Sequence, residues 1–514
     1  MIASIDVIGG GPAGLYVARL LKLRRPDLQV AVYERAPASA RTFGFGVGLT
    51  ESTMGNLHAA DPQTAAGVRD VSYAGHELLL KESGTTVKLH GARNLAIGRA
   101  ALLDVLAAAA TAVGVEIRRG VRFDPTMSRA DVVIAADGVS SASRDKVADE
   151  LGVTTSLGRT RFVWCGAGTA VPAAYFTSAA RGDAIFVAHA YPYAAGRSTF
   201  LIEADAETWR AAGLEDFDRA TPPGESDEQS VALLSELFAA DLGQRPLLTN
   251  RTRWTRFTDL SLQRWSCGNL VLLGDAAHTA HYTLGSGTKL ALEDAITLAD
   301  AITGEASRPA AFEVYERARR LKVDRFKQLA RRSQAWWDTY RLRRGWPADR
   351  LALSYMTRSG NLTLSDYAGA ETGVTRRALA GLGPDVPASA AELAPWILAQ
   401  PLATPVLSLP ARAVGDRDLP GAPIHRVAWA EPDVWGEAAD AQAGVLPDRR
   451  TPLLVTGTGG GAADQPGPIA ARTDFAERLR LQGHPCVGVT LPAGAREQAA
   501  TAIAAGRADF VVWA

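Results

Sequence analysis

The sequence predicts an α/β protein with more than one domain, and three stretches carry this prediction. A β-branched run near the N-terminus leads through a glycine-rich turn into an amphipathic helix. The middle of the chain alternates apolar and polar residues over several runs, which is typical of an antiparallel sheet with one packed and one open face. Towards the C-terminus, buried strands alternate with helices, and this pattern predicts a parallel sheet.

Composition narrows the classes of function. Hydrophobic residues make up 47% and charged residues 21% of the 514 residues, and the net charge is zero, as in ordinary soluble globular proteins. This balance argues against nucleic acid or an acidic membrane surface as the main partner, because phosphate binding needs surplus Lys and Arg. The scattered cysteines Cys165, Cys267 and Cys486 offer neither a disulfide framework nor a CxxC metal site. No signal peptide and no long apolar run is recognisable, so we expect a cytoplasmic protein.

The first motif is a strand, a glycine turn and a helix. The run Ile5–Ile8 is followed by GGGPAG, in which Gly9 permits a tight turn and Gly11 lets the backbone approach a pyrophosphate. Gly14 lets the helix lie close to the strand, and the helix N-terminus offers N–H groups to phosphates. A second strand ends in Glu34, where a carboxylate can bind ribose hydroxyls. The motif predicts a dinucleotide site, for NAD or FAD alike, at Gly9, Gly11, Pro12, Ala13, Gly14, Glu34 and Arg35.

Two later motifs favour a flavin. In DVVIAADGVSSASR (131–144) a buried strand runs into Asp137 and Gly138. In NLVLLGDAAHTAHYTLGSGTKLALEDA (269–295) another buried strand delivers Asp275, followed by a second glycine turn and a helix. An aspartate at the end of an apolar strand is costly to bury unless it is hydrogen-bonded, and a ribityl chain of hydroxyls is a suitable partner. The predicted contacts of these motifs are Asp137, Gly138, Gly274, Asp275, Gly285, Ser286 and Gly287.

With these three motifs in this order, the sequence resembles the class A FAD-dependent aromatic hydroxylases of the p-hydroxybenzoate hydroxylase type. The resemblance implies a Rossmann-like FAD-binding domain with an inserted antiparallel-sheet substrate domain. It also implies that Asp137 lies near the pyrophosphate and that Asp275 binds the ribityl chain. Arg99, in AIGRAALLDVL, matches the family arginine that opens a helix beside the FAD.

Several segments are similar to one branch, the anthraniloyl-CoA and salicylyl-CoA hydroxylases, with the violacein-pathway tryptophan hydroxylases nearby. They include TFGFGVGLTESTMGNLHAADP (42–62), FVWCGAG (162–168), FVAHAYPY (186–193) and the GDAAH motif with its glycine loop. The resemblance covers about residues 1–365. One departure is Arg41, which stands after Ala40 where that branch has acidic residues, so substrate identity does not transfer directly.

The substrate is expected to lie between the flavin and the antiparallel sheet. Aromatic residues of the sheet and of the loops beside it can flank a planar substrate, although ordinary sheet packing explains each of them about as well. His278 and His281 follow the GDAA turn and are expected to face the flavin. We expect no metal there, because no carboxylate or cysteine completes a ligand set. The candidate pocket residues are Phe45, Trp164, His189, Tyr191, Tyr193, His281 and Tyr282.

The resemblance also supplies the chemistry. NAD(P)H reduces FAD, O2 adds to form the flavin C4a-hydroperoxide, and an electron-rich ring takes the distal oxygen. The leading hypothesis is hydroxylation of an aminobenzoyl or hydroxybenzoyl thioester of CoA or a carrier protein. The alternatives are a hydroxylase or epoxidase of a free indole, phenol or quinone-type natural product, and an FAD-binding redox sensor or scaffold. The chain offers no second nicotinamide domain, since the glycines at 457–461 precede no good helix and NAD(P)H is expected to dock transiently.

A helical, arginine-rich stretch follows at residues 306–345. We expect a solvated face with Trp336 and Trp337 in the core, and a sharper hypothesis is that part of this face attracts CoA or pantetheine phosphates. The predicted organisation is an FAD-binding domain (1–75, 95–160 and 265–325), a substrate-binding sheet domain (76–94 and 161–264), a helical segment (326–375), a linker (376–410) and a C-terminal α/β domain (411–514).

The C-terminal domain reads as strands TPLLVTG, HPCVGVTL and ADFVVWA with two helices between them. It resembles the final strands of the Old Yellow Enzyme barrel, where residues 506–509 match the region that holds FMN phosphate. A (β/α)8 barrel needs roughly 200 residues, which are not left here. We therefore predict a truncated barrel remnant that binds no FMN and serves packing, homodimer contact or partner docking.

Overall fold

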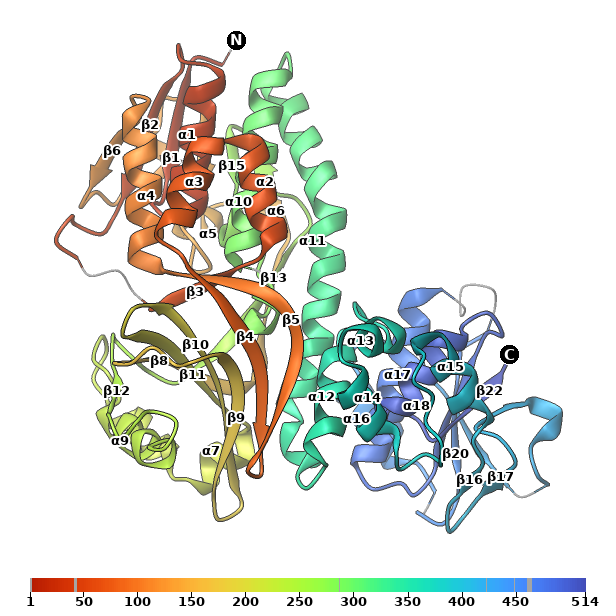
Figure 1. Ribbon diagram of the computed structural model, residues 1–514. Coiled ribbons are helices and arrows are strands. Elements are labelled where there is room, and N and C mark those ends of the chain that lie inside the picture. Colours follow the sequence, from red (N-terminus) through yellow and green to blue (C-terminus); the bar gives the residue numbers. More distant parts are fainter. Residues whose placement is uncertain (1, 41–43, 286, 422, 448, 460–464) are drawn as a thin grey trace. The chain divides into compact units, whose positions relative to one another are not determined.

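The computed structural model describes residues 2–40, 44–285, 287–421, 423–447, 449–459 and 465–514, and the side chains of 90–94 are left out as well. The chain forms two compact units (Figure 1). The first comprises Met1–Leu78 and Ala92–Gln334, and the second comprises Leu79–Gly91 and Ala335–Ala514. The motifs of the predicted flavin site all belong to the first unit.

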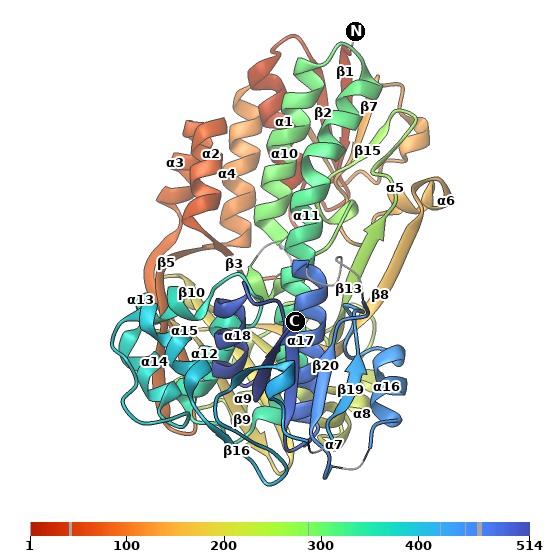
Figure 2. The ribbon, with the colours of Figure 1, turned by 90° about the vertical axis from the view of Figure 1, so that its right-hand side faces the viewer.

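A six-stranded sheet organises one half of the first unit, in the order β14-β15-β7-β1-β2-β6. Its strands pair in parallel, apart from the antiparallel pair β14 and β15. The helix α1 packs against both α4 and α10 (Figure 2). The strands are β1 (Ser4–Ile8), β2 (Gln29–Glu34), β6 (Glu116–Arg119), β7 (Val132–Ala135), β14 (Ser266–Cys267) and β15 (Leu270–Leu272), and the helices are α1 (Pro12–Arg24), α2 (Glu51–Ala60), α3 (Pro62–Asp70), α4 (Arg99–Ala112), α5 (Ala142–Asp145), α6 (Ala148–Leu151) and α10 (Gly287–Gly304).

The sequence explains this half directly. The β-branched side chains of β1, β2 and β7 are buried on both faces of the sheet, with Val7, Val32 and Ile134 fully enclosed. Pro12 stands in the first turn of α1, where its missing N–H costs nothing, and Arg24 lies in the last turn, where it favours the helix dipole. The predicted Rossmann-like half is confirmed, and β6 and β14 are further strands that the sequence did not predict.

An antiparallel sheet forms the other half, in the order β12-β8-β11-β10-β9-β4-β5-β3, with β13 also pairing β8. The outer ends of β4 and β5 (79–91) group with the second unit. The strands are β3 (Gly46–Leu49), β4 (Tyr73–Glu82), β5 (Thr85–Gly98), β8 (Val153–Ala167), β9 (Ala174–Arg181), β10 (Ala184–Ala194), β11 (Arg197–Ala204), β12 (Leu247–Leu248) and β13 (Thr255–Leu262). The predicted antiparallel sheet is confirmed.

The two faces of this sheet differ, as the alternation predicts. On one face Phe200 meets Phe238 at the end of α9, with ring centroids 5.5 Å apart, and α7 packs on the same strands. The other face carries Trp164, His189 and Glu203 on β8, β10 and β11. That second face is the one next to the flavin motifs. The helices on the side of Phe200, the first face, are α7 (Ala206–Ala211), α8 (Leu214–Ala220) and α9 (Glu228–Leu237).

The long helix α11 (Arg308–Asp338) ends in the second unit, where Trp336 and Trp337 are buried as predicted. The expected linker at 376–410 carries regular structure, including the helix α15 and a short hairpin of β16 and β17. The remaining helices of this part are α12 (Ala348–Thr357), α13 (Leu364–Ala370), α14 (Thr372–Leu379) and α15 (Ala390–Ala399), with strands β16 (Leu402–Ala403) and β17 (Ser408–Leu409).

A five-stranded parallel sheet closes the chain, in the order β18-β22-β21-β20-β19. The three predicted strands and the helices between them are confirmed, and the sequence reading missed two further strands. The first strand of the sheet in chain order, β18, lies beside the last, β22. The elements are β18 (Ala413–Gly415), β19 (His425–Ala428), β20 (Leu453–Thr456), β21 (Val487–Leu491), β22 (Phe510–Trp513), α16 (Glu437–Gly444), α17 (Pro466–Leu481) and α18 (Arg496–Ala504).

Candidate active site

The glycine turn after β1 is held by close backbone approaches. Gly9 has φ +112°, and a Cβ added to it would lie 2.3 Å from the carbonyl oxygen of Ala136. A Cβ added to Gly14 would lie 2.0 Å from the carbonyl oxygen of Gly9. These two positions therefore require glycine for the fold of the turn itself. Gly11 differs, because a Cβ there would meet nothing within 4 Å.

The open space at Gly11 lies at the N-terminus of α1. Among the described residues, no side chain caps this helix, so its first N–H groups point towards that space. The Glu34 carboxylate borders the turn, accepting hydrogen bonds from the Gly10 N–H at 2.7 Å and the Ala36 N–H at 2.7 Å. Arg35, next to it, is exposed. An uncapped helix N-terminus with unfilled space in front fits a pyrophosphate, and Glu34 keeps lone pairs for ribose hydroxyls.

The three motifs converge on this turn. The Cβ position of Gly9 lies 2.9 Å from the Asp137 nitrogen, which joins the first motif to the second. A Cβ added to Gly274, which has φ +62°, would lie 3.2 Å from the Ala13 methyl group. The third motif therefore lies against the first. The Cβ position of Gly287, at the start of α10, lies 3.9 Å from Asp275 Oδ1. Segments far apart in the sequence thus form one site, while Ser286, Arg41 and the glycines 460–461 lie outside the described residues.

Asp275 is exposed, although Gly274 and Ala276 on either side of it are buried. The surrounding protein atoms raise the pKa of its carboxyl, whereas the charge of Arg99 acts in the opposite direction, so the two side chains lie within electrostatic range. Arg99 opens α4, as predicted, and is itself exposed. An exposed carboxylate between buried neighbours is suited to a ligand with hydroxyl donors. Asp275 and Arg99 remain our candidates for contacts with FAD.

Hydrogen bonds stabilise the turn of the second motif. Asp137 accepts from the Ser141 hydroxyl at 2.5 Å and the Ser143 N–H at 3.0 Å, which fixes the start of α5. Arg144 ends the second motif, and the sequence predicted no role for it. It is buried and donates to the Ala276 carbonyl at 3.3 Å and to the Val139 carbonyl at 2.9 Å. It therefore ties the turn after β7 to the turn after β15. Gly138 has φ +84° with open space around its Cβ position.

Four of the predicted pocket residues come together around Tyr282, in the short helical turn η3 (Tyr282–Leu284). The Tyr282 ring centroid lies 4.2 Å from that of His281, 6.4 Å from that of Trp164 and 6.5 Å from that of His189. Tyr282 and Trp164 are half-buried, so both reach solvent in part. The arrangement forms an aromatic cluster between the flavin motifs and the antiparallel sheet.

The other three predicted pocket residues have packing roles nearby. The Phe45 ring packs directly on Gly166, and a Cβ added to Gly166 would lie only 2.5 Å from that ring. The Tyr193 ring covers Gly46 in the same way, with an added Cβ only 2.6 Å away. The Tyr191 hydroxyl donates to the Gly46 carbonyl at 2.7 Å, and burial raises the pKa of Tyr191 to about 12. These side chains join β3 to the sheet.

His278 lies beside a buried carboxylate. Its Nε2 lies 2.7 Å from Asp294 Oδ2, and Asp294 also accepts from Arg319 Nε at 2.6 Å. All three side chains are buried. The structure thus gives His278 a buried carboxylate partner on α10, and the expectation that it faces the flavin stays a prediction.

His281, by contrast, stays in the cluster. Burial, and next to it the charge of His189, lowers the pKa of His281 from 6.5 to about 3. Its Nδ1 lies 3.1 Å from the Thr283 hydroxyl, and a small cavity of about 10 Å³ adjoins the ring. His281 is therefore neutral at physiological pH and packs as an aromatic ring.

This shift predicts an acid-dependent loss of stability. Above pH 6.5 His281 is neutral in both states, and as the pH falls below 6.5 only the unfolded chain takes up the proton. One such group costs about 2 kcal/mol between pH 6.5 and pH 5. Urea unfolding at several pH values should show that His281→Asn flattens this decline. His58→Asn, at an exposed position, is the control, and an equal decline in both variants would contradict the prediction.

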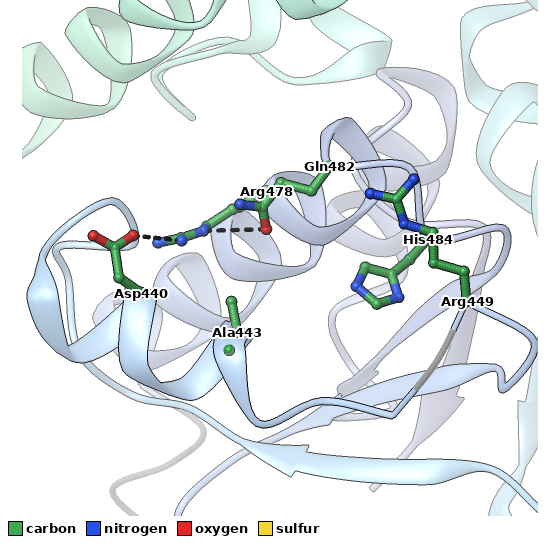
Figure 3. A pocket seen from close by; sticks show the side chains of 7 residues that line it. Asp440, Ala443, Arg449, Arg478, Gln482 and His484 are labelled. Atoms are coloured by element: carbon green, nitrogen blue, oxygen red, sulfur yellow. Dashed lines mark hydrogen bonds and ion pairs between the residues drawn. The ribbon is translucent and has the colours of Figure 1, made fainter.

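The second unit has a pocket of its own, of about 440 Å³, between α16 and the end of α17 (Figure 3). Arg478 lines it, but its guanidinium is 2.6 Å from Asp440 and donates to the Val434 carbonyl at 2.7 Å. Burial, and next to it the charge of Arg449, lowers the pKa of His484 on the opposite wall. None of the described residues that line this pocket is a predicted site residue.

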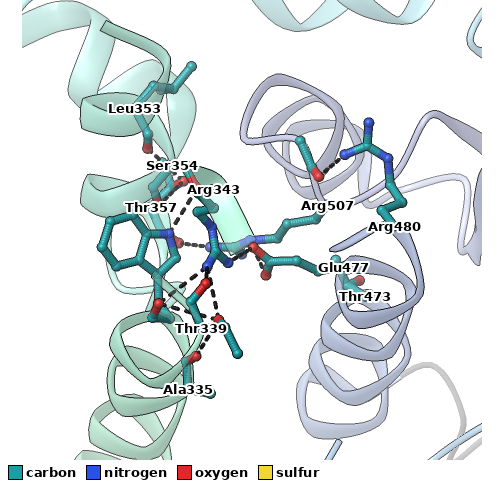
Figure 4. Close-up of polar contacts among 12 residues, drawn as sticks. Ala335, Thr339, Arg343, Leu353, Ser354, Thr357, Thr473, Glu477, Arg480 and Arg507 are labelled. Carbon is teal, nitrogen blue, oxygen red and sulfur yellow. Dashed lines mark hydrogen bonds and ion pairs between the residues drawn. The ribbon is translucent and has the colours of Figure 1, made fainter. Parts of the chain in front are cut away.

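Arg507, in the stretch that matches an FMN phosphate region, is also engaged within the second unit. Its guanidinium donates to the Thr357 carbonyl at 2.7 Å and lies 3.5 Å from the Glu477 carboxylate (Figure 4). Neighbouring Arg480 pairs with Asp509 at 2.9 Å. The guanidinium that would meet a phosphate is thus bound to protein groups.

Comparison with known proteins agrees with this geometry. A family model described as an FAD binding domain matches residues 124–330. The solved 2-methyl-3-hydroxypyridine-5-carboxylic acid oxygenase has the same fold, with a TM-score of 0.52 at 20% identity over 72% of this chain and 96% of that one. PqsL of P. aeruginosa, solved with 2-aminobenzoylacetate, gives the same TM-score and identity over 66% and 96%. The fold and the site define a flavoprotein of the class A hydroxylase type.

Two curated relatives place the chain within that class. Salicyloyl-CoA 5-hydroxylase from a Streptomyces species is 39% identical over 71% of this chain and 72% of its own length. The 3-hydroxy-4-methyl-anthranilyl-[aryl-carrier protein] 5-monooxygenase of Streptosporangium sibiricum is 37% identical over 71% and 96%. The chain belongs to the FAD-dependent aromatic hydroxylases, monooxygenases that use NAD(P)H and O2 on small aromatic substrates. Among the helices of the described residues, none is long and apolar enough to cross a membrane.

Proposed function

We propose that this monooxygenase hydroxylates an aminobenzoyl or hydroxybenzoyl ring carried as a thioester on CoA or on a carrier protein. Both curated relatives above are named for such substrates, one a CoA thioester and one a carrier-protein thioester. The observation that carries the proposal is the convergence of Asp275 and Gly287 beside the aromatic cluster around Tyr282. A flat ring and a flavin can meet there.

The residues that would hold FAD come from the three motifs. The N-terminus of α1 at Gly11 would take the pyrophosphate, Glu34 a ribose, and Asp275 the ribityl hydroxyls, with Arg99 close by. When bound, FAD supplies the redox chemistry that transfers one oxygen atom of O2 to an electron-rich ring at the expense of NAD(P)H. The chain's own part is to orient the ring and to exclude water.

The aromatic cluster is suited to that part. Trp164 and Tyr282 present ring surfaces to a planar substrate, and His281, neutral at physiological pH, adds an uncharged ring. Phe257 packs against the cluster, with its ring centroid 4.8 Å from that of His281. Side chains packed in this way hold a ring in place without reacting with it.

The test is a product measurement with the purified holoprotein. Aryl-CoA, aryl-carrier protein, the free acids and tryptophan are each incubated with NAD(P)H and O2, and products are identified by mass spectrometry. Stoichiometric hydroxylation of a thioester supports the proposal. Hydroxylation of tryptophan or a free phenol instead would favour a natural-product hydroxylase. NAD(P)H oxidation that yields peroxide alone would favour a redox sensor or scaffold.

We expect exposed cations of α11 to attract the phosphates of the thioester arm. Most of the cations of α11 are engaged: Arg319 with Asp294, Arg320 with Glu316, and Arg331 with Asp259. Lys322 and Arg325 are exposed one turn apart. They are our candidates for the phosphates of the CoA or pantetheine arm.

Reversing both charges, Lys322→Glu with Arg325→Glu, should raise KM for the thioester about tenfold and leave KM for the free acid unchanged. The control is the same reversal at Arg210 and Arg219, exposed on α7 and α8. Equal effects on the thioester and the free acid would contradict the prediction.

We also propose that the C-terminal sheet is a truncated barrel that has lost its cofactor. Two observations support this: β18 pairs with β22, the first strand beside the last, and Arg507 is held by Thr357 and Glu477. A closed barrel needs the same first-to-last pairing. Denaturing the purified protein should release FAD alone, and release of FMN as well would contradict the proposal.

A further inference from the structure

Glu203 is a buried acidic side chain for which the sequence predicted no role. It lies on β11 with 3% of its surface exposed. Its cross-strand neighbours on the same face of the sheet are Phe162 on β8 and Val187 on β10. A carboxylate there is costly unless it is hydrogen-bonded, and an apolar side chain would serve packing better. The position therefore points to a role beyond stability.

The partner of Glu203 comes from the flavin side of the site. The Tyr282 hydroxyl donates to Glu203 Oε1 at 2.8 Å, and His189 Nε2 lies 3.3 Å from the same oxygen. Tyr282 stands between Asp275 and Gly287 in the sequence, on the loop that brings the third motif to the flavin. This hydrogen bond therefore links the loop to β11 of the antiparallel sheet.

The direction of that bond has a chemical consequence. The Tyr282 hydroxyl donates its single hydrogen to Glu203 Oε1, so it has none left to donate to another group. Its oxygen then presents lone pairs to whatever lies on its half-buried side. A ring bearing an N–H or O–H group can donate to that oxygen, whereas a ring with a methoxy group or no substituent cannot.

We propose that Glu203 is a positioning residue that fixes the Tyr282 hydroxyl as an acceptor, and that Tyr282 thereby selects aromatic rings carrying an amino or hydroxyl donor. This inference rests on the proposed function and deepens it. Amino and hydroxyl groups also make a ring electron-rich. The rings that Tyr282 would select are therefore those that react most readily in the oxygen transfer. If the Tyr282 oxygen no longer accepts, a ring with an amino or hydroxyl group is buried with its donor unsatisfied and binds less well. A ring without such a donor is unaffected.

The test compares kcat/KM for an aminobenzoyl or hydroxybenzoyl thioester with that for the matching methoxybenzoyl thioester. Tyr282→Phe should lower the preference for the donor-bearing ring about 10- to 100-fold, with normal FAD content. Glu203→Gln is nearly isosteric, and its amide can donate to the Tyr282 oxygen, so it should lower the same preference with Tyr282 still present. Tyr175→Phe is the control, since Tyr175 is a buried tyrosine on the opposite face of the sheet.

The outcomes separate this inference from the proposed function. If the wild-type enzyme forms no hydroxylated aryl product, the proposed function fails. If it does, and both Tyr282→Phe and Glu203→Gln keep the wild-type preference, only the inference is overturned. A fall in activity on both substrates alike would also overturn it, because that marks a purely structural role. Should one variant not fold, the other carries the same comparison.

Discussion

Replacing Gly11 by alanine is expected to abolish FAD binding and leave the fold intact. A Cβ at Gly11 meets nothing within 4 Å, so the protein tolerates it, but the added methyl group would stand where the pyrophosphate is proposed to approach the backbone. We expect FAD affinity to fall at least about 100-fold, because one misplaced contact at a phosphate loop displaces several hydrogen bonds. The visible flavin spectrum of the purified protein measures this directly.

The matched variant is Gly14→Ala, one helical turn further on. Its Cβ would lie 2.0 Å from the Gly9 carbonyl oxygen, which belongs to the backbone and cannot move aside cheaply. This variant should lose FAD as well, but together with about 3 kcal/mol or more of unfolding free energy. The two variants thus separate a ligand contact from a packing contact within one motif.

The apo proteins decide the comparison. Urea unfolding without FAD should give Gly11→Ala the wild-type stability and place Gly14→Ala well below it. If Gly11→Ala retains FAD at the wild-type level, the proposed place of the pyrophosphate is wrong. If Gly14→Ala is as stable as the wild type, the close approach of α1 to the turn after β1 is wrong.

The sequence was most informative where sterics leave few choices. The glycines of the first turn have backbone contacts that forbid a side chain, so the pattern of residues 9–14 predicts the turn, the helix and the meeting with β7. The strand patterns of β8, β10 and β11 likewise follow from alternation against a packed face. Local rules of this kind predict these elements, whereas the Rossmann-like domain with its inserted sheet was implied by the family resemblance.

The direction of polar side chains was not predictable in this way. His278 and His281 stand three residues apart on one loop, yet one turns to the buried Asp294 and the other packs on Tyr282. Glu203 falls where alternation allows any residue, and only the position of Tyr282 across the sheet shows what it binds. Such contacts join distant segments, and a single sequence carries no record of them.

The second large effect is expected in the C-terminal half, at Glu477 on α17. Its carboxylate meets two buried guanidinium groups, accepting a hydrogen bond from Arg343 and lying 3.5 Å from Arg507 (Figure 4). Arg343 also donates to the Thr339 carbonyl at 3.1 Å, so the helical segment and the C-terminal sheet share one polar network. Glu477→Ala would remove a carboxylate that two buried arginines share.

Removing one member of a buried ionic group costs about 3–5 kcal/mol, because the remaining charges stay desolvated. We expect Glu477→Ala to lower the unfolding free energy of the second unit by this amount, while the flavin spectrum of the first unit is retained. Glu477→Gln keeps hydrogen-bond acceptors and should lose less. The control is Asp416→Ala, which breaks the exposed pair with Arg426 and should cost less than about 1 kcal/mol.

The result also bears on why Arg507 persists in a sheet without a proposed cofactor. If Glu477→Ala is strongly destabilising and Arg507→Ala is comparably so, the arginine has a packing role that needs no phosphate, and the double variant should show coupling between the two sites. If Arg507→Ala is neutral, the network does not depend on it, and its retention needs a ligand after all. Inorganic phosphate that stabilised the wild type but not Arg507→Ala would then favour an anion site over a structural one.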